Sequence, residues 1–265
     1  MPNMVAPLLH NEIAKAARTK LPYFGFAVTS LLSFLIFIVT EESADAENLN
    51  AWGYLSLSMQ LIFTDIGLIF IAIFSAMLIA EETGFGTARI VLSSPVSRWE
   101  FYTAKVLTGL LYAVVMSIIS LVISACFGLV NYKFGDVTDS MGLIYEQNEV
   151  ITNFLLAFFL SWIPLAAVVT YGVFVSTIVR KPGQAVAVTI GTIYLIDFTK
   201  HIIGIDPYVF TRYIGFSWRI FNEVAQGVEY QWTPEIWSML ALTLTYCFIT
   251  FAAGLTIFAK RDLNA

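Results

Sequence analysis

Charged residues are scarce in this chain. Lys, Arg, Asp and Glu make up 12% of its 265 residues, about half of the roughly 25% that is typical of a soluble domain. Apolar residues make up 58%. Because so little charge cannot cover a surface that faces water on all sides, the composition excludes an ordinary cytosolic enzyme and a disordered chain.

Basic residues are also fewer than acidic residues. The chain has 14 Lys and Arg residues against 19 Asp and Glu residues, which gives a net charge of -5. A protein that binds nucleic acid needs a basic surface to neutralise phosphates. We therefore expect no nucleic-acid partner.

Cysteines and catalytic signatures are also rare. The two cysteines, Cys126 and Cys247, lie inside apolar stretches and belong to no Cys-x-x-Cys pair or Cys/His cluster. We interpret both as packing residues and expect no metal site, with a disulfide or a metal ligand as the less favoured alternative. The sequence contains no Gly-x-Ser-x-Gly and no His-Glu-x-x-His, so we expect no catalytic residue and do not favour an intramembrane enzyme.

Long apolar stretches, by contrast, are abundant. A helix that spans a membrane needs about 20 mainly apolar residues. Six stretches meet this requirement, and they are continuous rather than alternating, which favours helices over a β-barrel. The sequence predicts an all-α membrane protein, with one transmembrane domain over residues 1–265 and spans near 21–40, 52–80, 106–131, 150–179, 182–203 and 236–259.

The distribution of basic residues predicts the orientation. Cytoplasmic segments carry an excess of Lys and Arg. With a cytoplasmic N-terminus, ten of the 14 basic residues fall on the cytoplasmic side, namely Lys15, Arg18, Lys20, Arg89, Arg98, Lys105, Arg180, Lys181, Lys260 and Arg261. We expect a multi-pass protein of the cytoplasmic (inner) membrane with both termini inside. A signal peptide is the alternative for the first span, but that apolar stretch is longer than a typical signal sequence.

Two further segments suit the membrane surface. Residues 5–20 combine an apolar stripe with a basic edge, which is typical of an interfacial amphipathic helix in contact with lipid headgroups; a short solvated helix is the alternative. Residues 204–235 are rich in aromatics but too broken for a span. They indicate re-entrant or interfacial half-helices between the fifth and sixth spans, with a simple aromatic belt as the alternative.

The segment between the second and third spans is the most informative. After Glu81 and Glu82 come a glycine-containing turn, a short apolar run and a proline. Ser97 and Glu100 then have the spacing of a capping box at the start of the next helix. A connection of this length, with both signs of charge, exceeds what a simple connector needs, so we interpret it as a docking surface.

These residues resemble a known family. Glu-Glu, then Gly-Thr-x-Arg-x-x-Leu-x-x-Pro-Val-Ser-Arg, then Lys105, between the second and third of six spans, is similar to the membrane subunit of ABC exporters of the second type. The resemblance implies a permease whose cytoplasmic coupling helix contacts a separate ATPase. It places that contact on Glu81, Glu82, Gly86, Thr87, Arg89, Pro95, Ser97 and Arg98.

The resemblance also implies partners. The sequence contains no Gly-x-x-x-x-Gly-Lys-[Ser/Thr] loop to hold a nucleotide. ATP and Mg are therefore expected in the partner ATPase, with no cofactor bound by this chain. A complete transporter of this kind contains two permeases, so we expect a second copy or a related chain.

Two acidic residues fall inside the predicted spans. A charged Asp at the bilayer centre costs about 2.5–3.5 kcal/mol on insertion scales, so Asp65 and Asp197 need a wet cavity or a partner. For Asp65 we favour a place in the translocation pathway, over an interhelical hydrogen bond. Asp197 has Lys200 and His201 three and four residues further on, and we favour a structural pair there. By resemblance, both acids fall on helices that line the translocation route.

The leading hypothesis is therefore a non-catalytic permease subunit of an ATP-driven exporter, with a hydrophobic or amphipathic cargo. The alternative is an ion-coupled secondary carrier that uses Asp65 and Asp197. That alternative leaves the segment after Glu82 unexplained, and the sequence shows no internal repeat of the kind such carriers contain.

Overall fold

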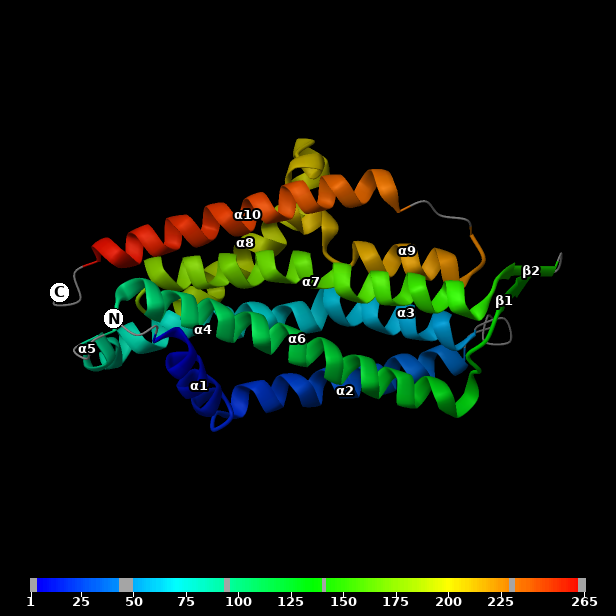
Figure 1. Ribbon diagram of the computed structural model, residues 1–265, viewed down its shortest axis with the longest axis horizontal. Coiled ribbons are helices and arrows are strands. Elements are labelled where there is room, and N and C mark those ends of the chain that lie inside the picture. The colour runs from blue at the N-terminus through cyan, green and yellow to red at the C-terminus, as the bar shows by residue number, and fades with distance from the viewer. Residues whose placement is uncertain (1–3, 43–49, 93–95, 140–141, 229–231, 262–265) are drawn as a thin grey trace.

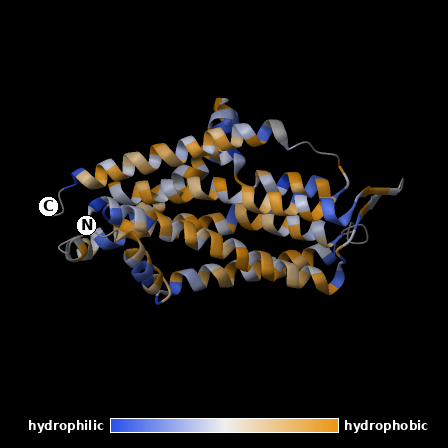
Figure 2. Ribbon diagram, in the orientation of Figure 1, coloured by the Kyte–Doolittle hydropathy of each residue, from blue (hydrophilic) through white to orange (hydrophobic). Residues whose placement is uncertain are grey.

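The computed structural model describes residues 4–42, 50–92, 96–139, 142–228 and 232–261 (Figure 1). Within these residues, six helices are long and apolar enough to cross a membrane, and Figure 2 shows apolar residues along their length. The chain is thus a helical multi-pass membrane protein, as predicted. The six are α2 (Lys20–Glu41), the continuous helix α3–η2–α4 (Ala51–Leu61, Ile62–Ile66, Gly67–Gly84), α6 (Arg98–Asn131), α7 (Gln147–Ile178), α8 (Pro182–Ile203) and α10 (Thr233–Lys260).

Shorter elements lie at the ends and beside the bundle. The two termini, α1 (Val5–Ala16) and α5 (Thr87–Leu92) gather at one end (Figure 1), called here the terminal end. The segment between α8 and α10 folds into η3 (Asp206–Tyr208), η4 (Phe210–Tyr213) and α9 (Phe216–Ala225).

A hairpin at the opposite end was not predicted. Strands β1 (Val137–Asp139) and β2 (Gly142–Tyr145) pair antiparallel between α6 and α7 (Figure 1). The prediction of helices alone missed it because strands of three and four residues are too short to produce a readable alternation of apolar and polar positions.

The centre of the bundle is the contact between α4 and α7. Gly172 of α7 packs against Ser75 and Ala76 of α4, where an added Cβ would lie 2.7 Å from the Cβ of Ser75. A Cβ added to Gly109 of α6 would likewise lie 2.7 Å from Cγ1 of Val169 on α7. Small residues let membrane helices approach each other, and the close packing that results holds the bundle together in lipid.

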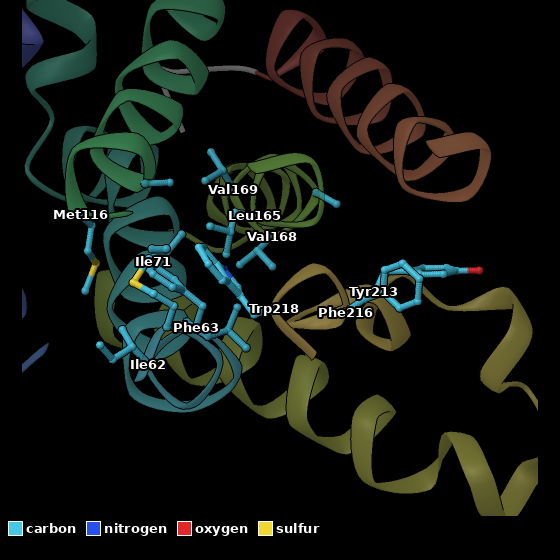
Figure 3. Close-up of a cluster of buried hydrophobic side chains, with 14 of the residues drawn as sticks. Ile62, Phe63, Ile71, Met116, Leu165, Val168, Val169, Tyr213, Phe216 and Trp218 are labelled. Atoms are coloured by element: carbon cyan, nitrogen blue, oxygen red, sulfur yellow. The ribbon is translucent and has the colours of Figure 1, made fainter. Parts of the chain in front are cut away.

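Helix α9 closes this core from the side. Trp218 is fully buried, and Figure 3 shows it among side chains of the α3–η2–α4 helix and of α7, including Phe63, Leu165 and Val168. The aromatic residues that made the sequence of this segment unusual are therefore largely packing residues. They fix the start of α9 beside η2.

The approach of α4 and α7 gives a direct test of the packing. The variant Gly172→Ala should lower the free energy of unfolding by about 1–3 kcal/mol, because the new methyl group meets the Cβ of Ser75. Gly191→Ala, on α8, is the matched control: nothing lies within 4 Å of its added Cβ, so stability should be unchanged or slightly raised. Thermal unfolding in detergent measures both. Equal stability of the two variants would contradict the close contact.

Candidate functional site

A group of paired charges lies where α1, α4 and α6 meet at the terminal end. The Lys105 ammonium is 2.6 Å from Glu12 Oε2 and 3.1 Å from Glu82 Oε1, and Lys15 also pairs with Glu82. We call these four residues the ion-pair cluster. The Lys105 side chain is only 1% exposed. A charge this deeply buried is tolerated only when it is paired, and here two carboxylates surround it.

Glu82 is the centre of the cluster because its side chain, on α4, contacts three other elements. Besides the lysines of α1 and α6, its carboxylate accepts a hydrogen bond from the hydroxyl of Thr87, the first residue of α5. The same hydroxyl lies 3.3 Å from the backbone carbonyl oxygen of Glu82. One carboxylate at the end of α4 therefore ties α1, α5 and α6 together.

The pKa of Lys15 reflects the balance of burial and charge in this cluster. Partial burial by itself would lower the pKa of Lys15. The hydrogen bond and the negative charge of Glu82 outweigh burial and raise the pKa above its ordinary value. Lys15 therefore stays protonated at neutral pH, and its pair with Glu82 stays intact.

The turn between α4 and α5 presents an exposed edge. Gly86 has a φ of +74°, a left-handed conformation that favours glycine. Beside it, the Phe85 side chain is 79% exposed, while Ala88 of α5 is buried. The turn therefore holds α5 against the bundle while Phe85 projects from the protein. Phe85 was not among the predicted contact residues, although an aromatic residue beside a glycine in that motif could have indicated it.

Three other predicted contact residues, Glu81, Arg89 and Pro95, lie near Gly86 in the sequence. Glu81 lines a small cavity of about 40 Å³ beside Lys15 and Lys105. Arg89 lies on α5, but its side chain is outside the described residues, and so is the whole of Pro95.

The predicted capping box is confirmed. The Ser97 hydroxyl accepts a hydrogen bond from the backbone N–H of Glu100, and the Glu100 carboxylate accepts one from the backbone N–H of Ser97 at 2.9 Å. The other carboxylate oxygen of Glu100 accepts the backbone N–H of Met4, also at 2.9 Å. The start of α6 is therefore fixed both to its own cap and to the start of α1.

Two arginines join the remaining helix ends, which the sequence did not predict. Arg98 Nη1 donates to the backbone carbonyl oxygens of Phe258 and Ala259 at 3.0 Å and of Arg261 at 2.6 Å. Arg261 in turn donates to the carbonyl oxygen of Thr177, at the end of α7, at 2.6 Å. Cations at helix C-termini satisfy free carbonyls and oppose the helix dipole. Arg98 therefore has a structural role within the chain, and the ends of α6, α7 and α10 are connected.

Asp65 lies on the π-helical turn η2, at the middle of the α3–η2–α4 helix, and is exposed. Its backbone carbonyl oxygen accepts a hydrogen bond from the Tyr194 hydroxyl at 3.1 Å, and its carboxylate lies 3.2 Å from the Thr64 hydroxyl. Single π-turns inside helices are frequent at functional sites. This turn connects α4 to α8.

Asp197 lines a cavity of about 200 Å³ between the α3–η2–α4 helix, α8 and the segment that leads into α9. Its carboxylate pairs with Lys200 at 2.7 Å, which confirms the predicted local pair. His201 instead lies 3.6 Å from Asp206. Asp65 does not line the cavity, although its neighbours Thr64 and Tyr194 do.

Several residues of the cavity were missed by sequence reasoning. Arg212 and Lys200 line it, and Asp206, beside the cavity, accepts a hydrogen bond from Arg212 at 2.6 Å and lies 3.8 Å from Lys200. No local spacing indicated this contact, because the chain between these residues is not a regular helix. The cavity is lined by Gln60, Thr64, Leu68, Ile193, Tyr194, Asp197, Lys200, Thr211, Arg212, Ile214, Gly215, Phe216 and Arg219.

Comparison with known proteins decides the family. A family model described as "ABC-2 family transporter protein" matches residues 8–197, which is more than half of the chain. The chain belongs to this ABC-2 family. The match includes the ion-pair cluster, the turn at Gly86 and both intramembrane acids, and ends before η3, α9 and α10.

The chain also resembles a curated bacterial protein. The chain is 24% identical over 223 residues to the uncharacterized protein YhcI of Bacillus subtilis (strain 168), an alignment that covers 80% of this chain and 69% of that protein. Together with the six apolar helices, the match to the ABC-2 family model identifies a membrane permease of an ABC transporter family. Membership of an ABC-2 transporter family implies an ABC ATPase as a partner in general.

The described residues contain no group of three or more His, Cys, Asp and Glu side chains arranged to hold a metal ion. The charges of the ion-pair cluster are instead paired with one another. Such an arrangement can transmit a force between helices, because moving any one element requires a buried ion pair to break or to move with it.

Proposed function

We propose that this ABC-2 permease is the membrane subunit of an ATP-driven exporter. The observation that carries the proposal is the position of Glu82, whose carboxylate joins α1, α4, α5 and α6 directly behind an exposed turn. A partner that pushes on α5 would act on three other helices at once. In this role α5 is the coupling helix and residues 1–265 form one permease domain.

The predicted contact residues then divide into two groups. Gly86, Thr87 and Ser97 are exposed, as are Phe85 and Trp99, and these would face the ATPase. Glu82 is 4% exposed and would transmit the movement. Coupling of this kind requires the two conformations of the permease to differ in their affinity for the states of the ATPase.

The remaining parts of the proposal follow from the same arrangement. The terminal end would be cytoplasmic, in the inner membrane, and α1 would lie against lipid headgroups. ATP and Mg would bind to the ATPase, and a second permease copy or a related chain would complete the pathway. The segment from η3 to α9 would form re-entrant half-helices, since the start of α9 lies beside the mid-helix turn η2 through the contact of Gly215 with Thr64.

An ion-coupled carrier remains the second candidate because Asp197 lines a polar cavity. Such a carrier would use Asp197 and Asp65 to bind protons or cations. It would work without an ATPase, and gradient-driven flux through vesicles that contain only this chain would support it. The four-element contact of Glu82 would then have no function in transport.

Copurification tests the proposal. The tagged chain, extracted from native membranes in mild detergent, should retain an ATPase subunit, and Phe85→Ser should reduce the retained amount several-fold, since Phe85 is the most exposed aromatic residue of the turn. Tyr208→Ser is the control, because Tyr208 is 71% exposed but belongs to η3, outside the turn. An ATPase that is absent, or retained equally by both variants, would count against docking at this turn.

A further inference from the structure

The cavity beside Asp197 has the features of an anion-binding site. We propose that it binds an oxyanion, a phosphate or carboxylate group, either free in solution or as the headgroup of a lipid or an amphipathic cargo. The cargo form of this inference rests on the proposed function. Binding itself does not, because it concerns this chain alone.

The first observation is the start of α9. Its N-cap is Gly215, with a φ of +73° and no side chain to cap the helix. Gly215 and Phe216 both line the cavity. The first N–H groups of a helix have no partner within the helix, and they carry the positive end of its dipole. An oxyanion at this point would accept those N–H groups, as anions do at many helix N-termini.

The close approach of α9 to η2 requires glycine at position 215. A Cβ on Gly215 would overlap the methyl group of Thr64. Only glycine therefore allows the start of α9 to reach the π-helical turn while keeping a left-handed conformation. Packing against Thr64 fixes the uncapped helix start beside the cavity.

A second, independent observation is an unpartnered hydroxyl. Thr211 lines the cavity and is 2% exposed, and its Oγ1 has no hydrogen-bond partner. Buried hydroxyl groups are nearly always hydrogen-bonded, because an unmade bond costs free energy. A bound oxyanion would accept the proton of this hydroxyl.

The charges around the cavity point to an anion rather than a cation. Lys200 pairs with Asp197, and Arg212 pairs with Asp206. Arg219 also lines the cavity; its guanidinium lies 5.7 Å from the centre of the Phe216 ring, and it makes no ion pair in the part of the chain that the structure describes. Among the residues that line the cavity, three cations face one acid, Asp197, while Asp206 and Asp65 lie beside it but outside its lining.

The size of the cavity limits the ligand. Its volume of about 200 Å³ is below the roughly 300–1,000 Å³ of sites that enclose a drug-sized molecule. It suits a headgroup or a small anion, and the apolar part of an amphiphile would have to lie outside the cavity, along the helices.

Two probes test the inference on the purified full-length chain without an ATPase. Inorganic phosphate is titrated by calorimetry, and retention of phosphatidylglycerol over phosphatidylcholine is measured by native mass spectrometry after reconstitution in an equal mixture of the two. We expect at least one probe to bind. Arg219→Gln should weaken that binding roughly tenfold and Thr211→Val several-fold, because each removes a donor. Binding of phosphate alone indicates a free anion, and selective retention of phosphatidylglycerol indicates a headgroup.

Two further variants decide the sign of the ligand charge. Asp197→Asn should strengthen binding several-fold, because it removes a carboxylate from the cavity and frees Lys200. Lys133→Gln removes an exposed cation outside the cavity and should change nothing. The inference is overturned if neither probe binds, if the Arg219 and Thr211 variants bind like Lys133→Gln, or if Asp197→Asn weakens binding. Failure of ATPase copurification would leave these results unaffected and would count only against the exporter.

Discussion

Replacing Lys105 with Met should destabilise this permease more than any other change of a single charge. The substitution leaves Glu12 without its 2.6 Å partner and removes one of the two lysines that neutralise the buried Glu82. Removing one partner of a buried pair leaves an uncompensated charge, and we expect a loss of about 3 kcal/mol. Thermal unfolding in detergent should show a midpoint lower by roughly 5–10 °C.

The control for this prediction is Lys133→Met, which removes an exposed lysine and should shift the midpoint by little. A double variant adds a sharper test. In Lys105→Met with Glu82→Gln, the buried Glu82, which lost one of its two lysines, is itself neutralised, while Glu12 stays without its partner. The double variant should therefore be more stable than the sum of the two single effects predicts. Strict additivity would show that the two side chains do not interact.

Glu82→Gln should instead leave the fold intact and uncouple the transporter. Lys105 keeps Glu12 as its partner, and the amide of the new glutamine can still accept the hydrogen bond from Thr87. The ionic contact between α4 and Lys15 of α1 is lost, however, and that between α4 and Lys105 of α6 is weakened. We expect ATP hydrolysis by the assembled complex to continue, while transport per ATP falls about tenfold, equivalent to about 1.4 kcal/mol of coupling free energy.

The measurement compares ATP hydrolysis with ATP-dependent efflux of a fluorescent amphiphile that the wild-type complex transports from proteoliposomes. Glu149→Gln is the matched control, because Glu149 is an exposed acid at the start of α7. It should leave the ratio of transport to hydrolysis unchanged. If Glu82→Gln also keeps the wild-type ratio, the ion-pair cluster is not part of the coupling path.

These two variants separate a structural role from a coupling role within one cluster. Lys105 is the only member of the cluster that is almost completely buried and contacts two carboxylates. Glu82 shares the buried Lys105 with a second acid, Glu12, so its replacement by Gln is better tolerated. Both side chains are buried, so the difference in expected stability comes from the number of charged partners that each substitution leaves unpaired.

Features that depend on neighbours in the sequence were predictable. The capping box of Ser97 and Glu100 and the pair of Asp197 with Lys200 join residues three positions apart, and such contacts follow from helix geometry alone. The six apolar stretches are equally local, because each must exceed the thickness of the bilayer.

Features that join distant segments were not predictable. Lys105 was recognised as part of the family motif and Lys15 as part of the basic edge of residues 5–20, but neither was expected to pair with Glu82, as both do. Arg98 was expected to contact the ATPase, and its guanidinium also holds the end of α10. Nothing in the local pattern indicated which acid, lysine or helix end would meet which, since those contacts depend on how the helices pack.

The sequence by itself determined that this is a membrane protein with six helical spans, because hydrophobicity along a single segment is enough to place it in lipid. It also determined the family, through a motif that occupies one contiguous segment. Only the tertiary structure decided that Glu82 connects four elements and that Arg219, Thr211 and the start of α9 surround one cavity. Those residues are brought together by the close packing of helices that are far apart in the chain. A single sequence does not show which distant segments will pack together, so these contacts could not be predicted from it.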